Sequence, residues 1–418
     1  MSSIRKSLLQ FVFSGAFMKR WNDKLRPMEL IELDKQAHKM MAAFVLYELN
    51  SKSLEMEERL ELGRRIVEGG LFDYFYRLII TDIKPPIFYQ IKANPDHFER
   101  LTVWVTQQLE PIMHPLGPRF WSRLKEHLTS DLRGENRDDP AMRILAASHL
   151  FASRWEFQLT RTINPHDDEF GEIESWFEEK LVQYDDLRGL RAMVSAKDSA
   201  LGRFLHLCGQ LRFQKRWSQA PRVPETSVIG HMFLVACYAY FFSLAVGACQ
   251  ARIQNNFFAG LFHDLPELLT RDIISPVKNS VQGLGDIIKE YEHNEMQRRV
   301  FGPLGAEGHD LIVERLRYFL GIEVGSEFQD AVRIGGRIEP SSFDALQNKF
   351  NENRFDPKDG EMLKICDRLA AFVEAYTALR NGVSSDQLQQ AVVKIRQDYH
   401  NFSLGDAVHV GALFADFD

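Results

Sequence analysis

Residues 260–276 read GLFHDLPELLTRDIISP, and residues 70–86 read GLFDYFYRLIITDIKPP. The two segments align without a gap, which matches Asp82 with Asp272 and Pro86 with Pro276. Self-similarity over such a distance is typical of a duplicated structural unit, and a missed duplication would misassign every later motif. We therefore interpret the chain as two related units that follow one another.

A second pair of segments supports the duplication. Residues 17–27 read FMKRWNDKLRP and residues 213–223 read FQKRWSQAPRV, with the same internal spacings. Between the paired segments, each unit has a long apolar stretch that opens with a histidine, His38 in the first unit and His231 in the second. Both stretches suit buried helices.

The hydrophobic periodicity predicts helices throughout. Residues 56–79, MEERLELGRRIVEGGLFDYFYRLI, place apolar side chains at three-to-four spacing, which is typical of a helix that buries one face. Alternating strand patterns flanked by hairpin turns are scarce. We expect an all-α protein made of two tandem helical bundles, residues 1–197 and residues 198–418.

The composition indicates a globular protein with a substantial core. The chain has 418 residues, of which 45% are hydrophobic, and its formal net charge is −7. This charge gives no general attraction for nucleic acid or for an anionic membrane, so neither is an expected partner. The longest apolar stretch, residues 233–249, fits a buried helix better than a membrane span.

The amino terminus and the cysteines suggest a cytoplasmic protein. The amino-terminal apolar stretch ends within a few residues and runs into Lys19 and Arg20, which makes an unconvincing secretion signal. The cysteines form no closely spaced metal-binding pair, and we expect reduced, mostly buried thiols. They are Cys208, Cys237, Cys249 and Cys366.

Four side chains of the second unit could hold a divalent transition metal. They are His231, the adjacent pair His263 and Asp264, and Asp367. Imidazole and carboxylate ligands suit manganese, cobalt, iron, nickel or zinc, and four of them can leave coordination positions open for water and substrate. The alternative is structural, because a lone histidine on an apolar helix is more often a core residue and an aspartate after an aliphatic run is often a helix cap.

The spacing of these residues resembles the H…HD…D pattern of the HD-domain phosphohydrolase superfamily. Within it, the chain is most similar to the 5′-deoxynucleotidase branch, through the Arg216-Trp217 pair and the segment HDLPELLTRDIISPVK at residues 263–278. The resemblance covers roughly residues 205–380. It implies an HD-domain fold and metal-dependent hydrolysis of a small phosphate ester such as a nucleoside 5′-monophosphate.

The chain departs from that branch at two places. Gly230-His231-Met232 stands where the branch carries glutamate-histidine-serine, and Arg271 stands where a glycine is common. Neither departure touches a metal ligand, but both can alter the groups around the ligands and the substrate pocket.

The resemblance also implies roles around the metal. Arg216 and Lys278 would bind the phosphate and Trp217 would pack on a base or sugar, although an ion-pair partner, a solvated lysine and a core aromatic are the alternatives. Glu267 would handle a proton, because four residues after His263 on a helix it would share that face, while Asp272 would orient water or contact the sugar. Glu267 could instead be a helix-start carboxylate behind Pro266, and Asp272 an N-cap.

The first unit lacks most of these groups. In the gap-free alignment, Asp73, Tyr74 and Arg77 replace His263, Asp264 and Glu267. Ala147 or a neighbour falls opposite Asp367, and only His38 and Asp82 keep their type. We expect a degenerate, non-catalytic domain that reproduces a homodimer contact within one chain, with a homo-oligomer as the other possibility.

Two other classes of function stay open. One is a nucleotide-sensing or scaffolding protein that binds but turns over little. The other is a different reaction of the same superfamily, phosphodiester cleavage or di-iron oxygenation. The chain has no GYP segment after the His-Asp pair, which weakens the cyclic-dinucleotide version.

Overall fold

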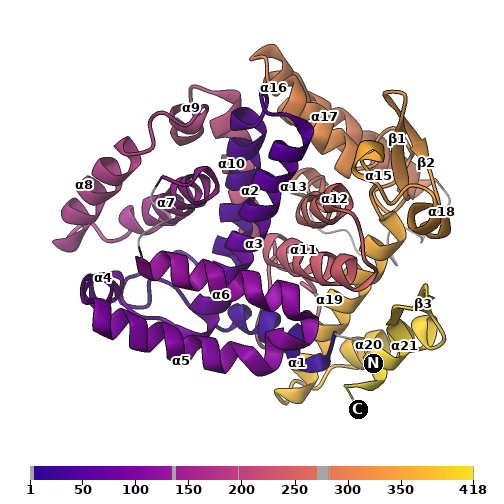
Figure 1. The fold of residues 1–418 in the computed structure, drawn as a ribbon, viewed down its shortest axis with the longest axis horizontal. Coiled ribbons are helices and arrows are strands. Elements are labelled where there is room, and N and C mark those ends of the chain that lie inside the picture. The colour runs from indigo at the N-terminus through magenta and orange to yellow at the C-terminus, as the bar shows by residue number, and fades with distance from the viewer. Residues whose placement is uncertain (1–3, 134–137, 196, 271–280, 282, 418) are drawn as a thin grey trace.

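The computed structural model describes residues 4–133, 138–195, 197–270, 281 and 283–417. Helices dominate these residues, and the strands among them form two short antiparallel hairpins (Figure 1). The prediction of an all-α fold is therefore confirmed.

The first half of the chain consists of helices of very different length. They are α1 (Lys6–Phe13), α2 (Glu32–Asn50), α3 (Met56–Ile80), α4 (Pro85–Ala93), α5 (Pro95–Met113), α6 (Pro118–Arg133), α7 (Pro140–Arg161), α8 (Glu169–Val182) and α9 (Leu190–Val194), with 3-10 turns at η1 (Ser14–Ala16) and η2 (His114–Leu116).

The second half contains the remaining helices and both hairpins. The helices are α10 (Ala200–Gln210), α11 (Val228–Ala245), α12 (Gln250–Phe262), α13 (Glu267–Thr270), α15 (Leu284–Met296), α16 (Gly302–Ala306), α17 (Asp310–Phe319), α18 (Phe343–Asn348), α19 (Gly360–Arg380), α20 (Asp386–Tyr399) and α21 (Val410–Ala415). The strands are β1 (Ala331–Ile334), β2 (Arg337–Pro340), β3 (Ser403–Leu404) and β4 (Val408–His409). The 3-10 turns are η3 (Leu211–Phe213) and η5 (Asn353–Phe355), and η4 (Gln297–Phe301) is a π-helical segment.

Helix α11 is the centre of the second half. Its sequence, VIGHMFLVACYAYFFSLA, is apolar on all sides, as expected of a helix surrounded by others. It packs against α12, α19 and α2. Among the described residues, α11 alone is long and apolar enough to cross a membrane, but 89% of that stretch is buried inside the protein. The sequence-based expectation of a buried helix is confirmed here.

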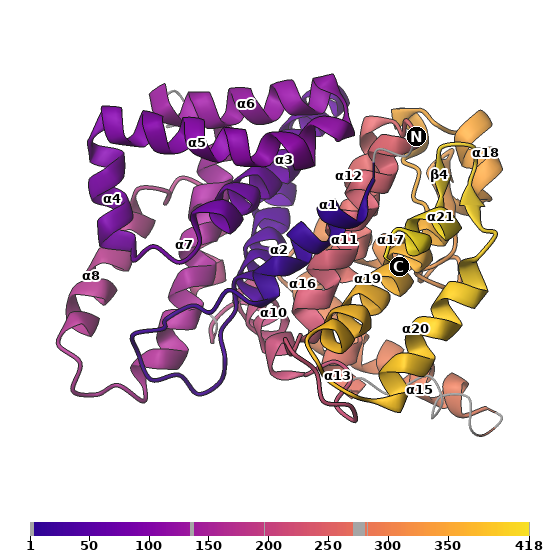
Figure 2. The same ribbon diagram turned by 90° about the horizontal axis from the view of Figure 1, so that it is seen from below.

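The two halves lie side by side and share one apolar core (Figure 2). Helix α2 of the first half packs on α11 of the second. The predicted boundary at residue 198 falls between α9 and α10. Arg212 also reaches into the first half, where Nη1 lies 3.0 Å from Oε1 of Glu156 with both side chains fully buried. The halves are therefore joined by polar contacts as well as by apolar packing.

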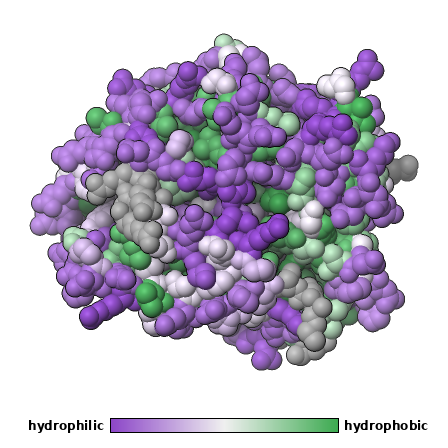
Figure 3. Space-filling model, in the orientation of Figure 1, coloured by the Kyte–Doolittle hydropathy of each residue, from purple (hydrophilic) through white to green (hydrophobic). Residues whose placement is uncertain are grey.

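The periphery is polar and the thiols lie inside. The face in Figure 3 is mostly hydrophilic, with small apolar areas between charged side chains. All four cysteines are free; Cys249 is partly exposed and Cys208, Cys237 and Cys366 are buried. This arrangement agrees with the expectation of reduced, mostly buried thiols.

Candidate metal centre

His231 lies one turn inside α11. Ser227 caps this helix, because its hydroxyl oxygen accepts a hydrogen bond from the backbone N–H of Gly230 at 3.0 Å. The imidazole is fully buried. The packing of α11 on α19 brings Nε2 of His231 to 2.9 Å from Oδ1 of Asp367. These two residues, far apart in the sequence, therefore meet.

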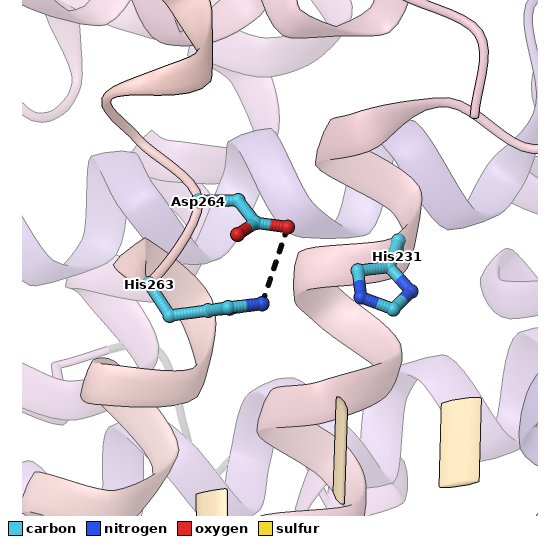
Figure 4. Close-up of side chains that lie close together, drawn as sticks. All are labelled: His231, His263 and Asp264. Atoms are coloured by element: carbon cyan, nitrogen blue, oxygen red, sulfur yellow. Dashed lines mark ion pairs between the residues drawn. The ribbon is translucent and has the colours of Figure 1, made fainter. Parts of the chain in front are cut away.

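His263 and Asp264 lie where α12 ends. Nδ1 of His263 lies 2.8 Å from the carbonyl oxygen of Gly260, to which it donates, and Nε2 lies 3.2 Å from Oδ2 of Asp264. Figure 4 shows this pair facing each other, with His231 on the neighbouring helix. Ligand atoms of His231, His263 and Asp264 all lie within 4.8 Å of one another. Asp367 joins the cluster through its contact with His231.

The charges in the cluster are strongly coupled. Burial by itself would lower the pKa of His263, but the carboxylates of Asp264 and Asp367 raise it to about 9. Burial opposes ionisation of Asp264, yet His263 and Arg216 hold the pKa of that carboxyl below its usual range. The pKa of Asp367 is lowered as well, against burial, by the hydrogen bond with His231. A positive charge at this place is therefore favourable.

The donor groups fit a divalent metal. Nδ1 of His263 carries the proton that Gly260 accepts, so in the neutral ring Nε2 presents a lone pair towards a carboxylate oxygen. This buried nitrogen makes no hydrogen bond to any described residue. Two lone pairs that face each other need a proton or a cation between them. Imidazole nitrogen with carboxylate oxygen is a ligand set that divalent transition metals accept.

Arg216 and Trp217 lie beside the cluster. Nη1 of Arg216 is 3.5 Å from Oδ2 of Asp264, and the side chain is only 13% exposed. Trp217 has a backbone φ of 56°, and its ring nitrogen donates to Oε2 of Glu374 at 3.0 Å. Arg216 is thus no surface ion-pair partner, since its partners belong to the cluster. The partly buried Trp217 ring packs on the core.

The remaining sequence-predicted residues are placed less completely. The expectation of one helix running from His263 to Glu267 is wrong, because α12 ends at Phe262 and Glu267 begins α13 after Pro266. Proline lacks the N–H that a continuing helix would use, which explains the break. Glu267 is nevertheless close enough to contribute to the field at Arg216. Asp272 and Lys278 lie outside the described residues.

Glu374 is a residue of this site that sequence reasoning missed. It is fully buried on α19 and accepts hydrogen bonds from Trp217 and from Thr226, the latter at 2.8 Å. The available signal was a charged residue in the apolar helical stretch FVEAYTAL, which is costly unless the carboxylate is paired.

The first half repeats the local geometry of the Arg-Trp segment. Trp21 also has a φ of 56°, and its ring nitrogen donates to Glu156 at 3.2 Å. An isolated antiparallel β-bridge joins Lys19 to Ile31, and another with the same spacing in the sequence joins Lys215 to Ser227. Helices α2 and α11 begin at the same distance after these segments.

This register corrects one pairing made from the sequence and specifies another. The residue opposite His231 is Lys35 and not His38. With Glu156 opposite Glu374, the residue opposite Asp367 is His149, two residues after Ala147. Nζ of Lys35 lies 2.7 Å from Nδ1 of His149, much as His231 lies against Asp367. The ring of His38 instead contacts the carbonyl oxygen of Leu205, and burial lowers its pKa to about 3.

Comparison with known proteins agrees with this geometry. Residues 208–396 match the model of the HD domain family, and this segment contains His231, His263, Asp264 and Asp367. The match supports placing this part of the chain in the HD superfamily of metal-dependent hydrolases, whose domains bind divalent metals. The chain matches no curated protein and no solved structure.

Proposed function

We propose that the second half is a metal-dependent phosphohydrolase that releases phosphate from nucleoside 5′-monophosphates or related small phosphate esters. The observation that carries this proposal is the meeting of two imidazoles with the carboxylates of Asp264 and Asp367, beside the guanidinium of Arg216. The resemblance to the 5′-deoxynucleotidase branch, through Arg216-Trp217 and the segment after His263, supports the choice of substrate.

His231, His263, Asp264 and Asp367 would hold the metal, which supplies an acidified water and polarises a phosphoryl oxygen when it is bound. Arg216 binds phosphate oxygens with its planar, multiply donating guanidinium. Its contacts with Glu374 and Asp264 hold this group at the edge of the ligand cluster. Trp217, the neighbour of Arg216, is the proposed contact for a base or sugar.

Glu267 is the proposed proton-handling residue. It begins α13 directly after the ligand pair, and its carboxylate contributes to the field at Arg216. A carboxylate in this position can take a proton from water or give one to the leaving oxygen. Asp272, for water or sugar, and Lys278, for phosphate, complete the proposed site on sequence grounds alone.

The first half is proposed to be a degenerate copy without catalytic activity. Lys35 stands opposite His231, and Asp73 stands opposite His263. Nζ of Lys39 donates to the carboxylate of Asp73 at 2.8 Å. Lys39 thus holds the carboxylate that stands opposite His263, and the Lys35 amine points to His149. We propose that a tandem duplication produced the two halves, and that their contact acts as an intramolecular pseudo-dimer.

Phosphate release from the full-length protein tests the proposal. The protein is stripped of metal with a chelator, given Mn²⁺ or Co²⁺, and screened against ribo- and deoxyribonucleoside monophosphates. We expect release to return with metal and to fall to background in His263→Ala and Asp264→Ala. Asp73→Ala is the matched control in the first half and should release phosphate at the wild-type rate.

Two outcomes would refute the proposal. Full activity in His263→Ala would remove the metal site from the reaction. Tight nucleotide binding without phosphate release, measured by calorimetry, would favour the nucleotide-sensing alternative instead.

A further inference from the structure

Glu374 joins three side chains that approach it from the loop before α11. Its carboxylate accepts from the ring nitrogen of Trp217 at 3.0 Å and from the hydroxyl of Thr226 at 2.8 Å. Nε of Arg216 lies 3.4 Å from Oε2. Because Glu374 itself is fully buried on α19, these contacts fix the Arg-Trp segment against the helix that also carries Asp367.

The same carboxylate faces the metal-ligand candidate His231. Nδ1 of His231 is buried and lies 3.5 Å from Oε1 of Glu374, which is a long contact without ideal hydrogen-bond geometry. Nε2 of the ring points the other way, to Asp367 at 2.9 Å. The ring of His231 therefore lies between two carboxylates, one of them within the ligand cluster and the other behind it.

The two nitrogens of the His231 ring have different roles when a metal is bound. When Nε2 of His231 and the carboxylate of Asp367 both serve as ligands, the proton of the neutral imidazole must reside on Nδ1. Nδ1 then donates towards Glu374. A carboxylate in this position fixes the tautomer and the orientation of the ring, and it makes the ligand nitrogen a better donor.

Glu374 depends on its donors because its side chain is fully buried. Each lost donor would leave the carboxylate without a partner in a place that water does not reach.

We propose that Glu374 is a positioning residue that couples the ligand His231 to the phosphate-binding pair Arg216 and Trp217. Metal affinity and nucleotide affinity then depend on one side chain that touches neither. The part that concerns the nucleotide rests on the proposed function, whereas the part that concerns the metal requires only the ligand cluster.

The first half offers a matched control. Glu156 is also fully buried, accepts from the ring nitrogen of Trp21 at 3.2 Å and from Nε of Arg20 at 2.8 Å. The residue opposite His231 there is Lys35, so this carboxylate has no ligand imidazole to orient. Glu156→Gln therefore reproduces the structural part of the change and leaves out the metal part.

The test compares Glu374→Gln with Glu156→Gln in the metal-stripped full-length protein. Titration calorimetry with Mn²⁺ alone should show a Kd raised about 10- to 100-fold in Glu374→Gln, the usual effect of losing a residue that orients a ligand. Glu156→Gln should keep the wild-type Kd. The KM for a nucleoside monophosphate should rise in Glu374→Gln as well, because Arg216 and Trp217 lose their anchor.

Wild-type Mn²⁺ affinity in Glu374→Gln would overturn the inference, and so would an equal loss in both variants, since that would be a general effect on the fold. If Glu374→Gln does not fold, Thr226→Val removes one donor to Glu374 and should still weaken Mn²⁺ binding, and an unchanged Kd would overturn the inference. A wild-type protein that binds Mn²⁺ but releases no phosphate would refute the proposed function and leave the metal part of this test intact.

Discussion

At the scale of single residues, the surroundings of Gly230 explain why a glycine stands directly before His231. A Cβ added at Gly230 would lie 2.6 Å from Oδ1 of Asp34, which is closer than real Cβ contacts. The glutamate expected before the first ligand has no room here, because a carboxylate from the first half already occupies that place. Ser227 donates to the same oxygen of Asp34 at 2.7 Å. A glycine before His231 thus leaves room for Asp34 of the first half.

Asp34 makes the stability of the protein depend on pH. Burial raises its pKa from 3.8 to about 7. Between pH 3.8 and pH 7 the folded protein keeps a proton on Asp34 that the unfolded chain has released. The free energy of unfolding is therefore highest below pH 3.8, as far as Asp34 is concerned, and it falls as the pH rises through 7. From about pH 5 to about pH 8, this carboxyl should lower the free energy of unfolding by about 2 kcal/mol.

Asp34→Asn should remove that part of the pH dependence, because an amide does not titrate. Urea denaturation of both proteins at the two pH values measures it. The expected result is a variant that gains stability over the wild type at the higher pH. Identical pH dependence in the two proteins would contradict the account of Asp34.

At the scale of elements, the packing of α2 on α11 predicts the cost of a side chain at Gly230. Gly230→Ala pushes a methyl group into Asp34 and should lower the free energy of unfolding by about 1–3 kcal/mol, the usual cost of overpacking. Gly171 in α8 is the control, because nothing lies within 4 Å of its added Cβ. Gly171→Ala should raise stability by about 0.5–1 kcal/mol through helix propensity. A neutral Gly230→Ala in urea denaturation would contradict the close contact.

The helices could be predicted from the sequence, and the structure brings the predicted ligand candidates together, whereas the pairing of His38 with His231 was wrong. Apolar periodicity predicts buried helices such as α11, and the adjacent His263 and Asp264 are recognisable in the sequence as a candidate ligand pair. Lys35 and His38 lie on the same apolar helix, so sequence similarity alone favoured the histidine. The correct choice follows from the offset of the Arg-Trp segments, 217 − 21 = 196, which places Lys35 opposite His231. The β-bridges from Lys19 to Ile31 and from Lys215 to Ser227 keep this offset.

Glu374 and Glu156 were unpredictable for a related reason. A lone glutamate in an apolar helix signals a buried partner, but the partner lies 157 residues away in one case and 136 in the other. The break after α12, by contrast, has a local signal in Pro266, and it agrees with the alternative interpretation of Glu267 as a helix-start carboxylate. Long-range contacts of polar side chains therefore carried the information that periodicity lacked.

At the scale of the whole molecule, the two halves depend on each other. Arg212 of the second half is paired with Glu156 of the first, and Asp34 of the first half accepts from Ser227, which caps the helix of His231. Helix α11, apolar on all sides, would expose the face that α2 covers if the halves were separated. These contacts support the proposed pseudo-dimer.

Residues 198–418 expressed alone are therefore expected not to fold into a metal-binding protein. Circular dichroism should show no cooperative unfolding, and co-expression with residues 1–197 should restore both solubility and Mn²⁺ binding. An isolated second half that unfolds cooperatively and binds Mn²⁺ like the full chain would contradict this interdependence.

The central claim is that the four ligands in the second half hold one divalent metal and that the first half holds none. Metal content per chain, measured by plasma mass spectrometry after loading with Mn²⁺ and removal of excess ion, tests it most directly. We predict about one ion per wild-type chain and almost none in His263→Ala, with Asp73→Ala unchanged. Equal metal content in the wild type and His263→Ala would contradict the account.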